Sequence, residues 1–453
     1  MAIMSAASTH PIRQSCGLLL GMALLLHVLP AAAGGFSVLD IGTRKTGMGA
    51  VVGRPDDLSA IYHNPAGLIL SRGTNLYLNT GLAVPRSSFQ LRPWPGSERY
   101  IGEPVDSTGY YPEAQPTSAY GVIPMVVAST DLGRDDLVLA LGVYVPNATG
   151  GSFDASGVAR YHLIDSYVIA GYLTGALAYR PHRMLTVAAA ASLVHIRLAG
   201  QRKFFPVIEG MDLGPLFGGD STLSISGRDW QGRGTLGLLF TPHPRLSIGA
   251  TVLTRVDISL EGEIALRSGP DALSQFEFNG THTTELIFPW VLQAGANIDV
   301  LTWLEMGIEL RYFLYSQFEE QRTRIDGIDL LDELVAPKDY RDSIHASGGV
   351  RVTLPFFPRL ELMLGVHYDR TPAPVTTVSL EQPAFNHFGL HSGLRCRLGR
   401  LRLGLTYAHF WYLERGTDNS LQQNPPTNFR ARATNDIVTL VTELSFDPWR
   451  GSR

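Results

Sequence analysis

The chain has 453 residues, of which 17% are charged and 45% are hydrophobic, and its formal net charge is only −4. Low charge with ordinary hydrophobicity excludes a disordered chain, and the near-neutral balance excludes a nucleic-acid-binding protein. The 47 glycines, 17 tyrosines and 19 phenylalanines, with lysine only at positions 45, 203 and 338, indicate a β protein whose apolar surface faces something other than water.

Residues 1–33 are predicted to form a secretory signal peptide. The apolar stretch 17–30 follows the basic residue Arg13, and Ala31-Ala32-Ala33 supplies the small residues that a signal peptidase requires. We expect cleavage after Ala33. An uncleaved membrane anchor is the alternative, but the apolar stretch is short for a span of about 20 residues. No later stretch approaches 18 uninterrupted apolar residues, which argues against a helical inner-membrane protein.

The remainder of the chain alternates with the period of two that is typical of β-strands. In 246–261 one face is expected to be apolar, with Leu246, Ile248, Ala250, Val252, Val256, Ile258 and Leu260. The opposite face is expected to be polar, with Ser247, Gly249, Thr251, Arg255, Asp257, Ser259 and Glu261. A run of about 15 residues exceeds a usual strand of a soluble sandwich and is long enough to cross a tilted path through a bilayer.

Four other segments repeat this pattern, with inward charges that include Glu309 and Arg395. Charges inside such long strands are costly against lipid but acceptable in a polar lumen. We therefore predict an all-β protein, a transmembrane antiparallel up-and-down β-barrel over 75–446. Its expected strands number about 14, at 75–92, 117–129, 136–147, 162–180, 184–200, 229–241, 245–262, 284–299, 302–317, 340–355, 358–370, 386–398, 400–412 and 434–446.

The connections between these strands are alternately long and short. The short joins fall around Gly133, 181–182, 242–244, Val300, 356–357 and Gly399. Short periplasmic turns and long outer loops are the signature of an outer-membrane barrel, and an even strand count places both termini in the periplasm. The last strand ends on Phe446, as signals for the outer-membrane assembly machinery tend to do, and is followed by an unusual short tail, 447–453.

Residues 34–74 do not alternate and carry a more specific signal. They contain Gly35-Phe36, Gly47-Met48-Gly49, Asp56-Asp57 and Asn64-Pro65-Ala66-Gly67. This segment resembles the N-terminal hatch of the FadL-type long-chain fatty-acid transporters, a family that includes aromatic-hydrocarbon channels. Further matches follow in order at Tyr144-Val145-Pro146, Asp229-Trp230, Gly237-Leu238-Leu239, Lys338-Asp339-Tyr340-Arg341, Asp369 and Pro372-Ala373-Pro374. Between Gly49 and Asp56 the chain is a few residues shorter than is usual in that family.

The resemblance implies a hatch at 34–74 inside the lumen and passive uptake of hydrophobic compounds, with long-chain fatty acids as the first expectation. By motif it assigns the ligand head group to Lys338, with a second basic contact between Arg197 and Arg202. It further implies lateral release, for which the hatch turn Asn64, Pro65 and Ala66 and a bend at Gly142 are the candidates, because proline fixes φ and glycine permits a bulge. We expect a monomer in contact with outer-membrane lipid.

Other functions are less favoured by the residues. His387 and His391 would lie roughly 13 Å apart on a strand, too far for one metal ion, so no metal or other cofactor is expected. Gly389-Leu390-His391-Ser392-Gly393 lacks the serine position of a nucleophile elbow, so we expect no enzyme. A general diffusion porin and a barrel-type outer-membrane enzyme are the alternatives that stay open.

Overall fold

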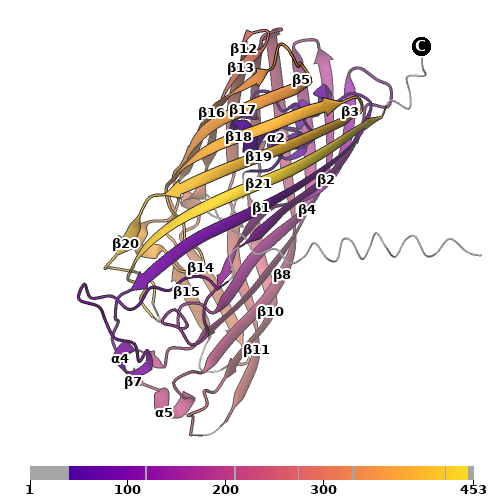
Figure 1. Cartoon of the computed structure of the whole chain (residues 1–453). Coiled ribbons are helices and arrows are strands. Elements are labelled where there is room, and N and C mark those ends of the chain that lie inside the picture. The colour runs from indigo at the N-terminus through magenta and orange to yellow at the C-terminus, as the bar shows by residue number, and fades with distance from the viewer. Residues whose placement is uncertain are drawn as a thin grey trace, which may run out of the picture.

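The structure, a computed structural model, describes residues 40–117, 120–208, 211–273, 275–328, 332–423 and 425–446. The expected signal peptide, 1–33, and the tail, 447–453, lie outside the described residues. No described helix is both long enough and apolar enough to cross a membrane. The chain forms a closed antiparallel barrel in which each strand pairs with its neighbours in sequence, and the last strand pairs with the first (Figure 1).

The described part of the barrel has 19 strand segments in one sheet. Five of the barrel strands are interrupted, so these segments make 19 − 5 = 14 strands, as predicted. The uninterrupted ones are β1 (Thr74–Leu91), β2 (Gly121–Thr130), β3 (Leu137–Ser152), β4 (Asp165–His182), β5 (Leu185–Lys203), β8 (Thr222–His243), β17 (Leu360–Asp369), β18 (His387–Leu398) and β21 (Phe429–Phe446).

The interrupted strands each consist of two segments that follow one another along the barrel wall. They are β9 (Leu246–Leu253) with β10 (Val256–Arg267), β11 (Glu277–Phe288) with β12 (Val291–Leu301), β13 (Leu304–Phe313) with β14 (Glu320–Asp326), β15 (Glu333–Pro337) with β16 (Ser343–Thr353), and β19 (Leu401–Tyr412) with β20 (Arg415–Thr417). Several strands, β8 and β21 among them, begin earlier than expected because the wall continues well beyond the apolar belt.

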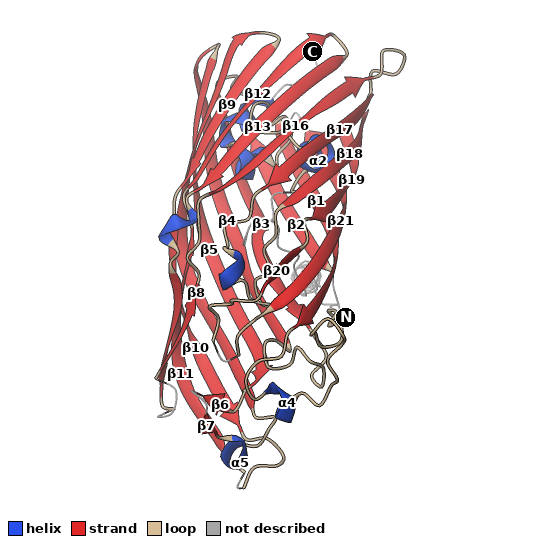
Figure 2. Cartoon of the chain, turned by 90° about the vertical axis from the view of Figure 1, so that its left-hand side faces the viewer, coloured by secondary structure: helices blue, strands red, loops and turns tan. Residues whose placement is uncertain are grey.

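Short helices and one small hairpin complete the described chain. Three helices precede the barrel, namely α2 (Thr43–Met48), α3 (Ala60–His63) and the 3₁₀ helix η1 (Pro65–Leu70). In the long connections lie α4 (Ser97–Tyr100), α5 (Gly214–Phe217) and η3 (Val375–Thr377), with the hairpin β6 (Val207–Ile208) and β7 (Met211–Asp212). The 3₁₀ helix η2 (Tyr315–Gln317) separates the two segments β13 and β14 of one interrupted strand. Figure 2 shows α2 enclosed by the barrel strands, near the end that carries the short turns.

An exposed apolar belt surrounds the end of the barrel with the short turns. Its outward side chains include Leu78, Leu141, Leu236, Ile308, Val366 and Leu440, each at least 48% exposed. Exposed aromatic residues border the belt, with Trp303 and Phe356 at the short turns and Trp230, Trp290, Tyr407 and Trp411 on the opposite side. Aromatic residues favour the two interfaces of a membrane, so these rows mark where the bilayer begins and ends.

Candidate functional site

The barrel interior changes from polar to apolar where strand β9 gives way to β10. In β9 the buried side chains are odd-numbered, and in β10 the even-numbered Val256, Ile258 and Leu260 are buried instead. The expectation of one uninterrupted face from 246 to 261 is therefore wrong. The strand has one extra residue relative to β8 around 254–255. Because side chains alternate with period two, this extra residue reverses which residues face the interior.

The interior beyond this point, on the side of the long connections, is lined by apolar side chains. They form one contiguous cluster that includes Phe89, Trp94, Phe153, Leu163, Phe205, Ile258, Phe288, Phe313, Phe318, Tyr340, Leu380 and Phe429. Many of the rings meet edge to face, as Phe318 and Tyr340 do with centroids 5.3 Å apart. Such a lining binds apolar molecules through burial, at about 0.8 kcal/mol for each methylene.

Lys338 projects its ammonium group into this region without a carboxylate partner. The side chain is only 2% exposed, and Nζ donates to Oε1 of Gln382 at 3.0 Å. No carboxylate among the described residues lies within ion-pair distance of Nζ. Burial lowers the pKa of Lys338 to about 8, and the nearby Glu381 opposes this shift. A buried ammonium with only an amide partner favours an incoming anion.

Of the two arginine candidates, Arg202 lies near Lys338 and Arg197 does not. The carboxylate of Glu381 interacts electrostatically with both Arg202 and Lys338. Arg197 is exposed on the outer face of β5, where even-numbered residues such as Ile196 point inward. Assigning Arg197 to the lumen is therefore wrong, because its odd position in the strand turns it away. The sequence did not predict a role for Glu381 and Gln382, because they lie in an irregular connection without a repeating pattern.

The hatch turn at Asn64 and Pro65 is fully buried and tied to the barrel wall. Asn64 Oδ1 accepts from the backbone N–H of Ala66 at 3.2 Å, and Pro65 occupies the first turn of η1. Nδ2 of Asn64 donates to the carbonyls of Val52 and Leu238, at 3.1 and 3.0 Å. Asn64 thereby contacts β8, where only glycine at 237 leaves room for its side chain.

The third strand is irregular, although not at Gly142. Gly142 pairs regularly with Val127 and Thr174, and the register shift lies between Tyr144 and Asn147. The expected bend is therefore misplaced, because Val145-Pro146 rather than the glycine interrupts the ladder; proline has no N–H to donate. Helix α3 faces this region, with the rings of Tyr62 and Tyr144 5.6 Å apart.

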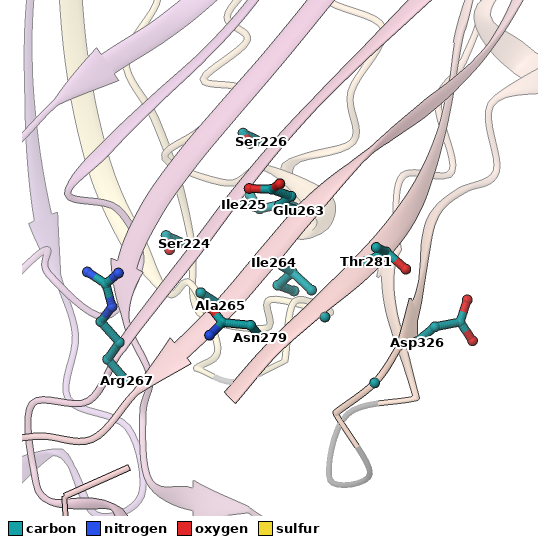
Figure 3. Close-up of a pocket in the computed structure, with 12 residues that line it drawn as sticks. Ser224, Ile225, Ser226, Glu263, Ile264, Ala265, Arg267, Asn279, Thr281 and Asp326 are labelled. Carbon is teal, nitrogen blue, oxygen red and sulfur yellow. The ribbon is translucent and has the colours of Figure 1, made fainter. Parts of the chain in front are cut away.

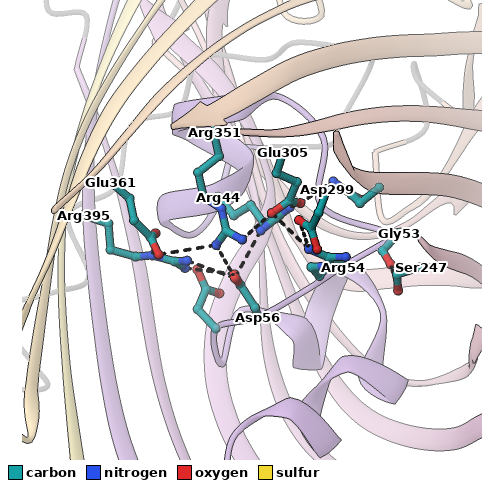
Figure 4. A network of polar contacts seen from close by, with 12 residues as sticks. Arg44, Gly53, Arg54, Asp56, Ser247, Asp299, Glu305, Arg351, Glu361 and Arg395 are labelled. Atoms are coloured by element: carbon teal, nitrogen blue, oxygen red, sulfur yellow. Dashed lines mark hydrogen bonds and ion pairs between the residues drawn. The ribbon is translucent and has the colours of Figure 1, made fainter. Parts of the chain in front are cut away.

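A network of charges joins the hatch to the barrel near the short turns (Figure 4). Asp56 of the hatch accepts from Arg44, Arg351 and Arg395, at 3.2, 2.7 and 2.9 Å. Arg54 reaches Asp299 at 2.7 Å, and Glu305 pairs with both Arg44 and Arg351. Glu361 pairs with Arg395 at 2.6 Å. Four arginines thus balance four carboxylates that come from the hatch and five strands of the barrel.

Glu309 is the centre of a second cluster deeper in the barrel. Its Oε2 accepts from the backbone N–H groups of Val51 and Val52 at 2.7 and 2.9 Å. Its Oε1 accepts from Lys45 at 2.9 Å and from Arg311 at 2.6 Å. The alternation in 302–317 correctly placed Glu309 inside the barrel, but only the folded hatch supplies its partners.

Four histidines line the wall beside this cluster. His345, His367, His387 and His391 come from β16, β17 and β18, and His367 Nδ1 lies 2.6 Å from His391 Nε2. His391 also contacts the carbonyl of Thr46, at 3.0 Å. Within the described ranges, no group of three or more His, Cys, Asp or Glu side chains is arranged to hold a metal ion.

Comparison with known proteins places the chain in a family. Residues 25–435 match the family described as outer membrane protein transport protein (OMPP1/FadL/TodX). The chain belongs to this family, which makes it an outer-membrane β-barrel transport protein of a Gram-negative bacterium. No curated protein matches the sequence in a direct search.

Solved structures share the fold at low sequence identity. A Pseudomonas aeruginosa FadL homologue is 16% identical, with a TM-score of 0.77 over 91% of this chain and 100% of its own. The toluene transporter TodX of P. putida is 16% identical, with a TM-score of 0.72 over 92% of this chain and 99% of its own. The CymD monoaromatic hydrocarbon channel is 15% identical, with a TM-score of 0.66 over 92% of this chain and all of its own.

Proposed function

We propose that this protein takes up hydrophobic carboxylates of the long-chain fatty-acid type across the outer membrane. The observation that carries the proposal is the buried ammonium of Lys338 in an apolar lumen, where its only hydrogen bond to a described residue is to the amide of Gln382. A fatty acid would satisfy both features, because its chain gains by burial and its carboxylate gains a charge-assisted hydrogen bond.

Uptake of neutral monoaromatic hydrocarbons is the second candidate. TodX and CymD are named for toluene transport and monoaromatic hydrocarbon passage. The lumen of this chain is rich in rings, for example Trp94, which meets Tyr111 and Phe205 with centroids 6.0 and 5.7 Å apart. A neutral ring would gain from these contacts but would leave Lys338 without a charged partner.

A general diffusion porin is less well supported. The described hatch residues 40–69 are nearly all buried, and they hydrogen-bond to strands on several sides of the barrel. A segment held in this way leaves little room for a continuous aqueous path. We propose that it plugs the lumen near the periplasmic end.

Replacing Lys338 by alanine tests the ligand class. We expect binding of a long-chain fatty acid to weaken by about 1.5–3 kcal/mol, the range for hydrogen bonds to charged groups. Binding of the corresponding methyl ester should be nearly unchanged, as measured by calorimetric titration of the purified barrel. Lys203→Ala is the matched control, since Nζ of Lys203 is bonded to Asp220 and Thr222 at the rim. If Lys338→Ala weakened binding of the acid and the ester equally, Lys338 would not bind the ligand head group.

The pH dependence of fatty-acid binding provides a separate test. Burial lowers the pKa of Lys338 to about 8, so the free protein loses this positive charge as the pH rises through that value. A bound carboxylate favours the charged lysine, so we expect affinity for the acid to be full below pH 8 and to decline above it. The methyl ester should show no such decline, and neither should the acid with Lys338→Ala. A pH-independent affinity for the acid would contradict the proposal.

Lateral release into the bilayer is the proposed exit route. Strands β2 and β3 pair only between Met125–Thr130 and Leu139–Tyr144, although β2 begins at Gly121 and β3 continues to Ser152. Residues 146–149 of β3 are all buried, so this part of the strand turns into the lumen. The axial alternative would carry an apolar ligand through the charges around Asp56 and Glu309, at the cost of its burial energy.

Loosening the hatch turn should slow this exit. Asn64→Ala removes two hydrogen bonds to backbone carbonyls, each worth about 0.5–1.5 kcal/mol. We expect slower uptake of radiolabelled fatty acid in cells, with binding to the purified barrel largely retained, and the same for Pro65→Ala. Asn279→Ala, at an exposed position on the outer wall, is the control. If the Asn64 and Pro65 variants took up fatty acid at the parental rate, with normal amounts of protein at the cell surface, the Asn64-Pro65 motif would be only a turn.

A further inference from the structure

A pair of arginines lies on the outside of the barrel, just beyond the membrane belt. Arg197 of β5 and Arg228 of β8 are directly opposite in the ladder, and both are exposed on the outward face. Like charges at opposed positions repel each other, so such a pair is unfavourable unless an anion lies between them. Among the described residues, neither guanidinium has a carboxylate within ion-pair distance.

The level of this pair relative to the membrane is defined by the row next to it. His195 and Trp230 are opposed in the same ladder, and their rings stack with centroids 4.2 Å apart. On the far side of this aromatic row the outward residues are aliphatic, with Leu193 48% and Leu236 64% exposed. Two residues along a strand span roughly 7 Å, so the arginines lie at the depth of lipid head groups in the outer leaflet.

The wall around the pair is hollowed rather than flat. A cavity of about 890 Å³ is lined by residues that include Tyr167, Arg197, Arg228 and Trp230. A second hollow of about 780 Å³ adjoins it farther from the membrane and shares Ser226, Glu263 and Thr281. Figure 3 shows this second hollow, which polar and apolar side chains from β8, β10 and β11 line together with Asp326 of β14. From the membrane outward, the wall is thus aliphatic, then aromatic, then basic, and then mixed, with polar residues and charges of both signs.

We propose that this surface binds the phosphorylated head group of an outer-leaflet glycolipid of the lipid A type. The phosphate would lie between Arg197 and Arg228, the acyl chains along Leu193 and Leu236, and the sugars toward Ser226 and Thr281. Basic residues at the membrane surface recognise anionic lipids, and guanidinium groups bind phosphate through paired hydrogen bonds. The outer leaflet is the source at this level, because the arginines lie on the side of the long loops.

Acidic residues limit the site on one side. Glu261 is opposite Arg228 in the next ladder, and Glu263 follows on the same outward face of β10. These carboxylates repel a phosphate, which restricts it to the space between β5 and β8. Glu261→Gln is therefore expected to tighten lipid binding, whereas loss of the arginines weakens it.

The test measures lipid bound to the purified full barrel in detergent by native mass spectrometry. With bisphosphorylated lipid A, we expect R197Q/R228Q to weaken binding about tenfold or more, from two surface arginines. The control R183Q/R245Q removes two exposed arginines at the short turns, on the other side of the membrane, and should leave binding unchanged. Dephosphorylated lipid A should bind all variants alike, and excess inorganic phosphate should not displace bound lipid A.

Three results would overturn the proposal. Equal effects of the two double variants would mean that the arginines act only through net charge. Equal binding of phosphorylated and dephosphorylated lipid A by the parent protein would mean that the site does not recognise the phosphate. Complete displacement by inorganic phosphate would make the site one for a free anion. The test is independent of the molecule that the lumen carries.

Discussion

Removal of the Glu309 carboxylate is expected to release the hatch from the barrel wall. Glu309→Ala leaves the buried Lys45 and Arg311 without their shared carboxylate and the N–H groups of Val51 and Val52 without their acceptor. Breaking a buried ion pair from one side costs about 3–5 kcal/mol, because an uncompensated charge stays in the interior. The measurement is single-channel conductance in planar bilayers, where we expect frequent or permanent opening to small ions.

A matched control distinguishes the hatch from the stability of the barrel. Glu285→Ala removes a glutamate that is exposed on the outer wall and paired there with Arg324. It should leave both conductance and the heat-resistant migration of the barrel unchanged. If Glu309→Ala keeps the parental low conductance while the barrel is intact, the hatch is held by other contacts and the central role of Glu309 is wrong.

Two glycines of the barrel wall are expected to be as important as the charges. A Cβ at Gly249 would overlap the carbonyl oxygen of Val52, and a Cβ at Gly365 would overlap that of Met48. These neighbours are backbone atoms of the hatch and cannot rotate away. Overpacking costs about 1–3 kcal/mol for each site, and distant sites add, so G249A/G365A should destabilise hatch docking by about 2–6 kcal/mol.

Protease protection is the measurement for this second prediction. Cleavage within residues 40–71 of the purified barrel should become much faster in G249A/G365A than in the parent. The control is G171A/G175A in β4, where an added Cβ meets no atom within 4 Å. Unchanged protection in G249A/G365A, with the barrel folded, would mean that the hatch shifts without cost.

The sequence alone determined the architecture of the wall. Period-two alternation in 302–317 and 358–370 correctly assigned Ile308 and Val366 to the lipid and Glu309 and Asp369 to the interior. The short joins also lie close to their expected positions; the one between β4 and β5 is at 183–184, next to the expected 181–182. These features are local, because a strand's own pattern reports which of its faces is apolar and its turn residues report where it ends.

The side of the wall on which β10 buries its residues was decided only by the tertiary structure. The extra residue at 254–255 turns Val256, Ile258 and Leu260 into the lumen, and that is what makes the upper interior apolar. A period-two pattern cannot reveal such an extra residue, because the residues on either side of it still alternate regularly. The structure also separated the two arginine candidates: β5 is regular, its even-numbered residues face inward, and Arg197 therefore faces outward.

The contacts of the hatch also required the folded molecule. Asp56 meets Arg395, which is 339 residues away along the chain, and Asn64 meets Leu238, which is 174 residues away. Their partners are set by barrel closure, which brings β1 against β21 and so fixes which side chains face the same space. The family resemblance implied that residues 34–74 lie inside the lumen; only the closed sheet decided which side chains and carbonyls they contact there.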